Sequence, residues 1–253
     1  MEKTEVKPRK ESKKDELNLD LEEMLKAGLH FGHRVTNGHP KMAPYLQGVR
    51  NGVQIIDLEK TAEKLKEALK FIQKLISDGK ILLFVGTKIQ IKNLVKEIAT
   101  DCDLPYVNER WLGGTFTNFE VLKKRIEYFK DLERKKETGE LEKYTKRERL
   151  KIDEELERLR KKFEGIKKME RLPDTVFVLD MRKDELAIKE AKMKGVTVIG
   201  ICDSNVDPSL ADYIIPANDD AIPSVKYILE KAKGAILRSR KEVKGKEEEK
   251  KED

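Results

Sequence analysis

The sequence predicts a doubly wound α/β domain that carries an inserted helical hairpin. Short apolar runs rich in β-branched residues alternate with amphipathic helical stretches, a pattern typical of a parallel sheet covered by helices on both faces. The runs are continuously apolar rather than alternating, as expected of strands buried on both sides. A highly charged segment with apolar residues at helical spacing interrupts this alternation and predicts the hairpin.

The predicted strands cover residues 53–56, 81–85, 176–179, 196–201 and 213–215, and the predicted helices cover residues 60–76, 89–99, 184–193 and 222–237. Residues 1–17 and 241–253 mix Lys and Glu with almost no apolar side chains, so we expect two disordered, charged tails. The α/β domain is then formed by residues 18–118 and 169–240, with the hairpin insertion over residues 119–168.

The insertion contains two apolar seams with the three-and-four spacing of coiled coils. One seam consists of Phe119, Leu122, Ile126 and Phe129, and the other of Ile152, Leu156, Leu159, Phe163 and Ile166. A polar stretch that includes Gly139 separates them, so the two helices are expected to fold back as an antiparallel coiled-coil hairpin. At about 1.5 Å per residue, arms of about 20 residues project about 30 Å, which suits a device that reaches a partner.

The net charge of the chain is concentrated in this insertion. The 253 residues include 54 Lys or Arg and 48 Asp or Glu, for a formal charge of +6. Residues 121–171 contain 19 Lys or Arg and 13 Asp or Glu, a surplus equal to the charge of the whole chain. A neutral domain with a basic appendage favours a polyanionic partner, although a solvated hairpin whose charges serve solubility explains the charge alone equally well.

Composition excludes several classes of protein. A hydrophobic fraction of 38% is enough for one folded core and excludes full disorder. No run approaches the roughly 18 uncharged apolar residues of a membrane span, and the charged amino terminus does not resemble a signal peptide. Cys102 and Cys202 form no CxxC pair, which argues against a disulfide scaffold or a cysteine zinc knuckle. We therefore expect a cytosolic protein without a membrane anchor.

Two features at the predicted strand ends resemble enzyme sites. Gly86-Thr87-Lys88 lies between a strand and a helix, where helix amino termini bind phosphates. Since the chain lacks GxxxxGK[ST] and GxGxxG patterns, a tight turn is favoured over a nucleotide site. Asp180 and Asp203 also follow strands directly, and they are suited either to hold Mg²⁺ or act as acid and base, or to cap the next helix or turn.

The three histidines, His30, His33 and His39, lie within ten residues of one another in a glycine-rich segment. Clustered imidazoles ligate transition metals such as zinc, and a carboxylate such as Asp203 or Asp220 completes the ligand set if the fold brings it near. The residues alone favour the alternative, in which the imidazoles pack or contact phosphates.

The segment ERWLGGTFTN, residues 109–118, holds the only tryptophan and precedes the insertion. Gly113-Gly114 permits a sharp bend, and Asn118 is suited to cap the first hairpin helix. The segment is therefore expected to anchor the hairpin, with RNA stacking by Arg110 and Trp111 as the alternative.

Seven strings of the chain, in order between about residues 18 and 240, are MLKAGLHFGHRV, HPKMAPYLQGVRNGVQIIDLEKT, FVGTK, RWLGGTFTNF, PDTVFVLD, ICDSNVDP and IPANDDAIPSV. Together they resemble the bacterial-type family of the second protein of the small ribosomal subunit. The chain departs from that family at His39 and Ala217, where the family often has Asn and Gly.

The resemblance implies a flavodoxin-like fold with an inserted coiled-coil hairpin, and a structural protein rather than an enzyme. It implies binding to small-subunit rRNA, entry late in subunit assembly, contacts with other small-subunit proteins and help in docking ribosomal protein one. It implies a cytoplasmic location, no required cofactor and no small-molecule substrate. It also singles out His33, Asp203 and Asp220 as the set best suited to a metal such as zinc.

We expect cations of the hairpin and loops to neutralise rRNA phosphates while the α/β domain fixes their positions. The candidates, chosen by charge and motif membership, are Arg34, Lys41, Arg50, Lys88, Arg110, Lys123, Lys124, Arg125, Lys161 and Lys162.

Two other classes of function are alternatives to RNA binding. A nucleotide- or phosphosugar-binding enzyme can use the same fold, but it requires a closed phosphate loop that the sequence lacks. A hairpin that binds only proteins predicts balanced charge in the hairpin, whereas the surplus lies there.

Overall fold

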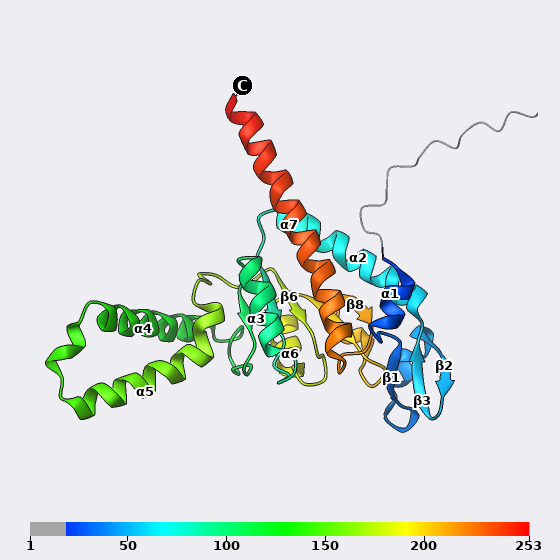
Figure 1. Ribbon diagram of the computed structural model, residues 1–253, viewed down its shortest axis with the longest axis horizontal. Helices are drawn as coiled ribbons and strands as arrows, with labels where there is room; N and C mark the ends of the chain where they lie inside the picture. The colour runs from blue at the N-terminus through cyan, green and yellow to red at the C-terminus, as the bar shows by residue number, and fades with distance from the viewer. Residues whose placement is uncertain (1–18, 253) are drawn as a thin grey trace, which may run out of the picture.

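The main sheet has five parallel strands in the order β5-β4-β6-β7-β8 (Figure 1). The computed structural model describes the backbone of residues 19–252 and the side chains of residues 19–243. Along the chain, the strands are β4 (Leu82–Val85), β5 (Tyr106–Val107), β6 (Thr175–Val178), β7 (Thr197–Cys202) and β8 (Tyr213–Pro216). Numbered within the sheet, the order is 2-1-3-4-5, that of flavodoxin-like folds. The predicted doubly wound α/β architecture is confirmed.

Helices cover both faces of this sheet. The helices on the first face are α1 (Leu21–Lys26), α2 (Leu58–Ser77), α3 (Lys92–Asp101) and α7 (Ile222–Glu252). The second face packs against α6 (Glu185–Met193) and the base of the hairpin. Successive strand residues point to opposite faces, so Phe84 and Phe177 enter the first core while Leu83 and Val176 enter the second.

The amino-terminal region forms a separate antiparallel sheet in the order β1-β3-β2. Its strands are β1 (Phe31–Arg34), β2 (Leu46–Arg50) and β3 (Val53–Ile56). The prediction that residues 53–56 belong to the parallel sheet is wrong. Asn51 and Gly52, with φ of 51° and 75°, form a two-residue turn between β2 and β3, and such a turn makes the strand pair with its neighbour in the chain.

The inserted segment forms two helices that lie side by side and project from the body (Figure 1). They are α4 (Phe119–Glu137) and α5 (Lys146–Phe163), with the 3-10 helices η3 (Glu140–Lys143) between them and η4 (Glu164–Ile166) after them. Gly139 opens the connection with a φ of 76°, a left-handed conformation that glycine adopts without strain. Buried residues of both predicted seams, including Phe129 and Leu156, join an apolar cluster that continues into the body.

Local sequence signals explain some helix ends and not others. The Asp57 carboxylate accepts the N–H groups of Glu59 and Lys60 and begins α2. Thr145 begins α5 with a capping box. Asn118 occupies the N-cap position of α4, but its side chain makes no capping hydrogen bond, contrary to the prediction.

The predicted tails have different outcomes. The backbone of α7 is helical as far as Glu252, whereas the sequence predicts a disordered tail over residues 241–253. Lys and Glu are good helix formers, so a helix does not have to end where its apolar residues end. The predicted tail over residues 1–17 lies outside the described residues. Within the described part of the chain, no helix is both long enough and apolar enough to cross a membrane.

Candidate nucleic-acid interface

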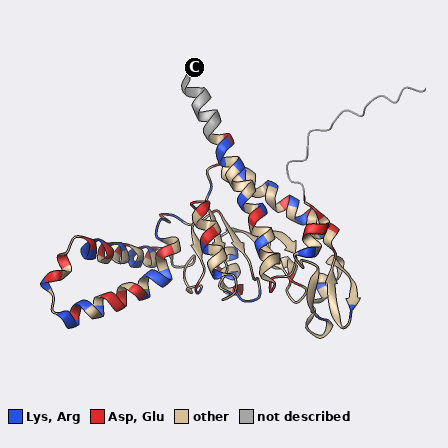
Figure 2. Ribbon diagram, in the orientation of Figure 1, with Lys and Arg blue, Asp and Glu red and all other residues tan. Residues whose placement is uncertain are grey.

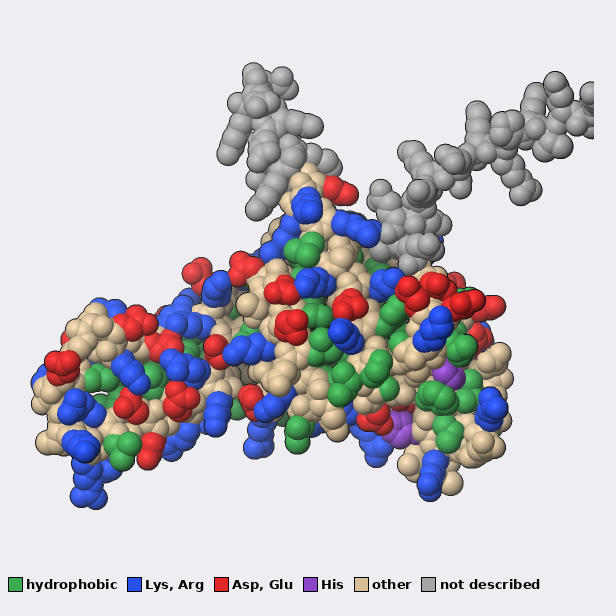
Figure 3. All heavy atoms as spheres, in the orientation of Figure 1, with side chains coloured by type: hydrophobic (Ala, Val, Ile, Leu, Met, Phe, Trp, Pro, Cys, Tyr) green, Lys and Arg blue, Asp and Glu red, His purple; other side chains and the backbone are tan. Residues whose placement is uncertain are grey.

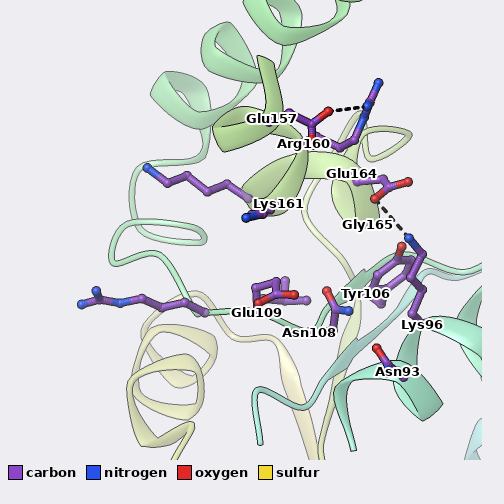
Figure 4. A pocket seen from close by; sticks show the side chains of 13 residues that line it. Asn93, Lys96, Tyr106, Asn108, Glu109, Glu157, Arg160, Lys161, Glu164 and Gly165 are labelled. Atoms are coloured by element: carbon purple, nitrogen blue, oxygen red, sulfur yellow. Dashed lines mark hydrogen bonds and ion pairs between the residues drawn. The ribbon is translucent and has the colours of Figure 1, made fainter. Parts of the chain in front are cut away.

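A groove of about 210 Å³ lies where the hairpin meets the α/β body. Its walls come from α3 and the loop after β5 on the body side, and from the end of α5 and η4 on the hairpin side (Figure 4). The polar residues that line it include Asn93, Lys96, Asn108, Glu109 and Arg110 of the body, and Glu157, Arg160, Lys161, Lys162 and Glu164 of the hairpin. Five of these residues are cationic and three are acidic, and the cations lie on both walls of the groove.

Ion pairs hold only some of these cations. Lys96 lies 3.2 Å from Glu164, and Arg160 lies 2.8 Å from Glu157 (Figure 4). Three exposed cations have no ion-pair partner among the described residues: Arg110, Lys161 and Lys162. Exposed cations on two walls of a groove are suited to a phosphate backbone.

The fold brings these three cations together from distant parts of the sequence. Arg110 follows the carboxyl end of β5, while Lys161 and Lys162 lie in the last turn of α5, where the helix dipole favours positive charge. Gly165 allows the two walls to meet, because a Cβ there would lie only 2.1 Å from the carbonyl oxygen of Tyr106. The sequence identifies each of these cations as a candidate, but it does not predict that they lie in one groove.

The other predicted RNA contacts are spread over the molecule. Three of them lie in the first turns of α4: Lys123, Lys124 and Arg125. Arg34 and Arg50 are exposed on the antiparallel sheet, at the opposite end of the molecule from the hairpin (Figure 1). Lys41 is exposed but lies 2.7 Å from Asp207. Basic and acidic residues alternate along the hairpin (Figures 2 and 3). The groove is where cations of the hairpin lie close to cations of the body.

Lys88, the remaining candidate, is engaged inside the protein. Its ammonium lies 2.8 Å from Asp180, 2.7 Å from Asp219 and 2.8 Å from Asp220. Burial lowers the pKa of Lys88, but the attraction of the neighbouring carboxylates is larger than this effect and raises the pKa above its ordinary value. Burial and the charges of Asp180 and Asp203 raise the pKa of Asp219 to about 7. Internal ion pairs therefore hold the Lys88 ammonium, and its contact with RNA stays a prediction.

The turn before this lysine is also satisfied internally. The N–H and the hydroxyl of Thr87 donate to the carboxylate of Asp184 at 3.2 and 2.8 Å. A Cβ at Gly86 would lie 2.9 Å from side-chain carbons of Leu179 and Val95, so glycine is needed here for close packing. These contacts favour the tight turn over a phosphate site.

The structure brings the three predicted metal ligands together but uses them differently. His33 Nδ1 lies 3.1 Å from Asp203 Oδ1, and His33 Nε2 lies 3.3 Å from Asp220 Oδ2. The hydrogen bond to Asp203, partly offset by burial, raises the pKa of His33. Both ring nitrogens of His33 are therefore placed beside carboxylate oxygens. No group of three or more His, Cys, Asp or Glu side chains in the described part of the chain is arranged to hold a metal ion, so the zinc prediction is not supported.

The other two histidines have separate surroundings. The ring of His30 packs on Phe31 with a centroid distance of 3.9 Å. His39 Nδ1 accepts the backbone N–H of Lys41 at 3.3 Å and begins a 3-10 helix. The structure therefore favours packing and capping for these two residues.

Trp111 is excluded as a stacking platform for RNA. Its side chain is 7% exposed and packs edge-on against Phe116, with ring centroids 4.8 Å apart. Because a base can stack only on an accessible ring, Arg110 is the one member of this pair that is placed to contact RNA.

The main sheet, the groove and the ion pairs around Lys88 all lie within the match to one known family. The family model described as ribosomal protein S2 matches residues 24–239, a range that includes all of these features. Members of this family are structural components of the small ribosomal subunit. The chain belongs to the ribosomal protein S2 family.

Proposed function

We propose that the chain binds small-subunit rRNA as a structural constituent of the small ribosomal subunit in the cytoplasm, and that it catalyses no reaction. The observation that carries this proposal is the family match over residues 24–239. The unpaired cations of the groove support it independently, because RNA binding requires exposed positive charge at fixed positions.

In this proposal the groove receives a stretch of rRNA backbone. Arg110 contacts phosphates from the body, and Lys161 and Lys162 contact them from the hairpin. A guanidinium binds a phosphate through two parallel N–H groups, whereas an ammonium binds it as a point charge. Folded RNA is recognised largely by its shape and backbone, so the spacing between these two walls selects the RNA.

The hairpin, residues 119–168, is proposed to be an antiparallel coiled coil inserted between residues 18–118 and 169–240. Its buried seam residues support this arrangement. Further contacts with RNA are proposed for the exposed candidates Arg34, Lys41, Arg50, Lys124 and Arg125, and for the half-buried Lys123.

Three finer properties are proposed from the family resemblance. They are entry late in subunit assembly, contacts with other small-subunit proteins and help in docking ribosomal protein one. No residue of this chain is assigned to them.

Salt dependence of RNA binding tests the proposal. We expect the affinity for a transcript of small-subunit rRNA to fall on the order of 10²-fold or more between about 50 and 200 mM KCl, because phosphate contacts release counterions. Filter binding over a salt series measures the slope, with an unrelated transcript of equal length as the control. Salt-independent binding, or equal affinity for the control transcript under all conditions, would contradict the proposal.

A further inference from the structure

The buried carboxylate of Glu190 holds the loop from which the hairpin starts. Glu190 lies on α6 and is 4% exposed. One oxygen accepts the indole N–H of Trp111 at 3.3 Å and the backbone N–H of Gly114 at 2.8 Å. The other accepts the backbone N–H of Phe116 at 2.9 Å, and the N–H and hydroxyl of Thr117 at 3.2 and 3.3 Å. Both carboxylate oxygens of this one side chain thus accept hydrogen bonds from donors in one short loop.

The negative charge of Glu190 is balanced by these donors rather than by a cation. No lysine or arginine among the described residues forms an ion pair with it. Burial alone would raise the pKa of Glu190, but the N–H groups outweigh burial and lower the pKa. A carboxylate accepts hydrogen bonds at both oxygens and donates none, so the loop is matched to the charged form.

This loop is the direct origin of α4. The N–H of Thr117 is held two residues before Phe119, where α4 begins. The N-cap residue Asn118 contributes no side-chain capping bond, and Gly114 turns the loop with a φ of 92°. The start of α4 is therefore fixed through Glu190 rather than through a cap of its own.

The hairpin has a second attachment on its return path. Gly165 in η4 packs directly against Tyr106 in β5, with no room for a Cβ. The groove lies beside this contact, with Arg110 on the body and Lys161 on the hairpin. The width of the groove therefore depends on both attachments, one at Glu190 and one at Gly165.

We propose that Glu190 is a positioning residue for RNA binding: by holding residues 111–117 it sets the direction of the hairpin and the spacing between Arg110 and the pair Lys161 and Lys162. This inference rests on the proposed RNA-binding function. Glu190 does not touch the RNA. It holds the two walls of the groove at the spacing that the RNA requires before the RNA binds. Binding therefore does not include the entropic cost of ordering the hairpin.

The variant that tests this is Glu190→Gln, which keeps the size of the side chain but turns an acceptor oxygen into an N–H donor. Nitroxide labels on Lys70→Cys in α2 and Lys151→Cys in α5, both exposed positions, report the distance between body and hairpin. The native cysteines are buried and do not compete for the label. We expect Glu190→Gln to broaden the distance distribution and to weaken binding to the rRNA transcript about tenfold.

The matched control is Glu185→Gln, on the same helix, whose exposed carboxylate pairs with Lys189. It is expected to change neither the distances nor the affinity. If Glu190→Gln does not fold, Glu190→Asp keeps the charge on a shorter side chain and is expected to broaden the distribution to a smaller extent.

The two measurements separate failure of this inference from failure of the proposed function. A folded Glu190 variant whose distance distribution matches the wild type overturns the positioning role, whatever the RNA result. A broadened distribution with unchanged RNA affinity also overturns it, while leaving the RNA-binding function in place. If the wild-type protein itself does not bind the transcript, the proposed function fails and the link between Glu190 and RNA fails with it.

Discussion

The Lys88→Met variant is expected to lose about 3 kcal/mol of unfolding free energy at neutral pH, because removing the ammonium leaves buried carboxylates without a counter-charge. Asp180 and Asp219 are 4% and 2% exposed, and both lie within 2.8 Å of the Lys88 ammonium. Methionine fills a similar volume, so the loss arises from charge rather than from a cavity. Urea unfolding of the two proteins measures the difference.

The loss should depend on pH in a defined direction. Without Lys88, the pKa of Asp219, about 7 in the wild type, rises further. A carboxyl group with a raised pKa in the folded protein keeps its proton at a pH where the unfolded chain has lost it. The free energy of unfolding therefore falls as the pH rises from the ordinary pKa to the raised one. The loss of unfolding free energy in Lys88→Met, relative to the wild type, is therefore smaller at about pH 5 than at about pH 8.

Lys92→Met is the matched control, because Lys92 forms an exposed ion pair with Glu109 at 3.0 Å. This variant is expected to change the free energy of unfolding by no more than about 0.5 kcal/mol. A Lys88→Met protein as stable as this control would show that the carboxylates do not depend on the lysine.

The second large effect concerns the groove. Replacing Arg110, Lys161 and Lys162 together with Gln is expected to weaken binding to the rRNA transcript on the order of 10²-fold at about 0.1 M salt. The plot of log affinity against log salt should also become less steep, its negative slope shrinking in magnitude by about 2 to 3, since each lost phosphate contact removes slightly less than one unit. Filter binding over the same salt series gives both quantities.

The control for the groove variant removes the same charge elsewhere. Lys26, Lys70 and Lys74 are exposed on α1 and α2, outside the groove. Their replacement with Gln is expected to weaken binding much less. Equal losses from the two triple variants would mean that net charge, and not the groove, determines the affinity.

Much of the fold follows from local patterns in the sequence. The apolar runs 81–85, 176–179, 196–201 and 213–215 correspond to β4, β6, β7 and β8, because continuous apolar runs are favoured only where both faces are covered. The sequence does not predict strand β5, since two residues are too few to form a pattern. The apolar pattern of residues 53–56 does not distinguish the two sheets, because it is the same in either one. The signal that favours a local hairpin is the Asn51-Gly52 dipeptide.

The site was less predictable because its contacts join distant segments. The sequence identifies Arg110 and Lys161 as cations, but only the packing of Gly165 on Tyr106 brings them to one groove. Lys88 looks like a free loop cation in the sequence, and its three carboxylate partners lie at least 92 positions further along the chain. Glu190 lies among the alternating charges of an ordinary helix, and no local pattern separates it from exposed glutamates.

Sedimentation with ribosomal subunits shows directly whether the chain is a constituent of the small subunit. A lysate of cells that express the full-length tagged chain is separated on a sucrose gradient, and the fractions are probed for the tag and for small-subunit rRNA. We expect the chain to sediment with the small subunit and to be released when subunits are washed in high salt. A chain that stays among free proteins at the top of the gradient, while host subunits remain intact, would contradict its assignment as a constituent of the small subunit.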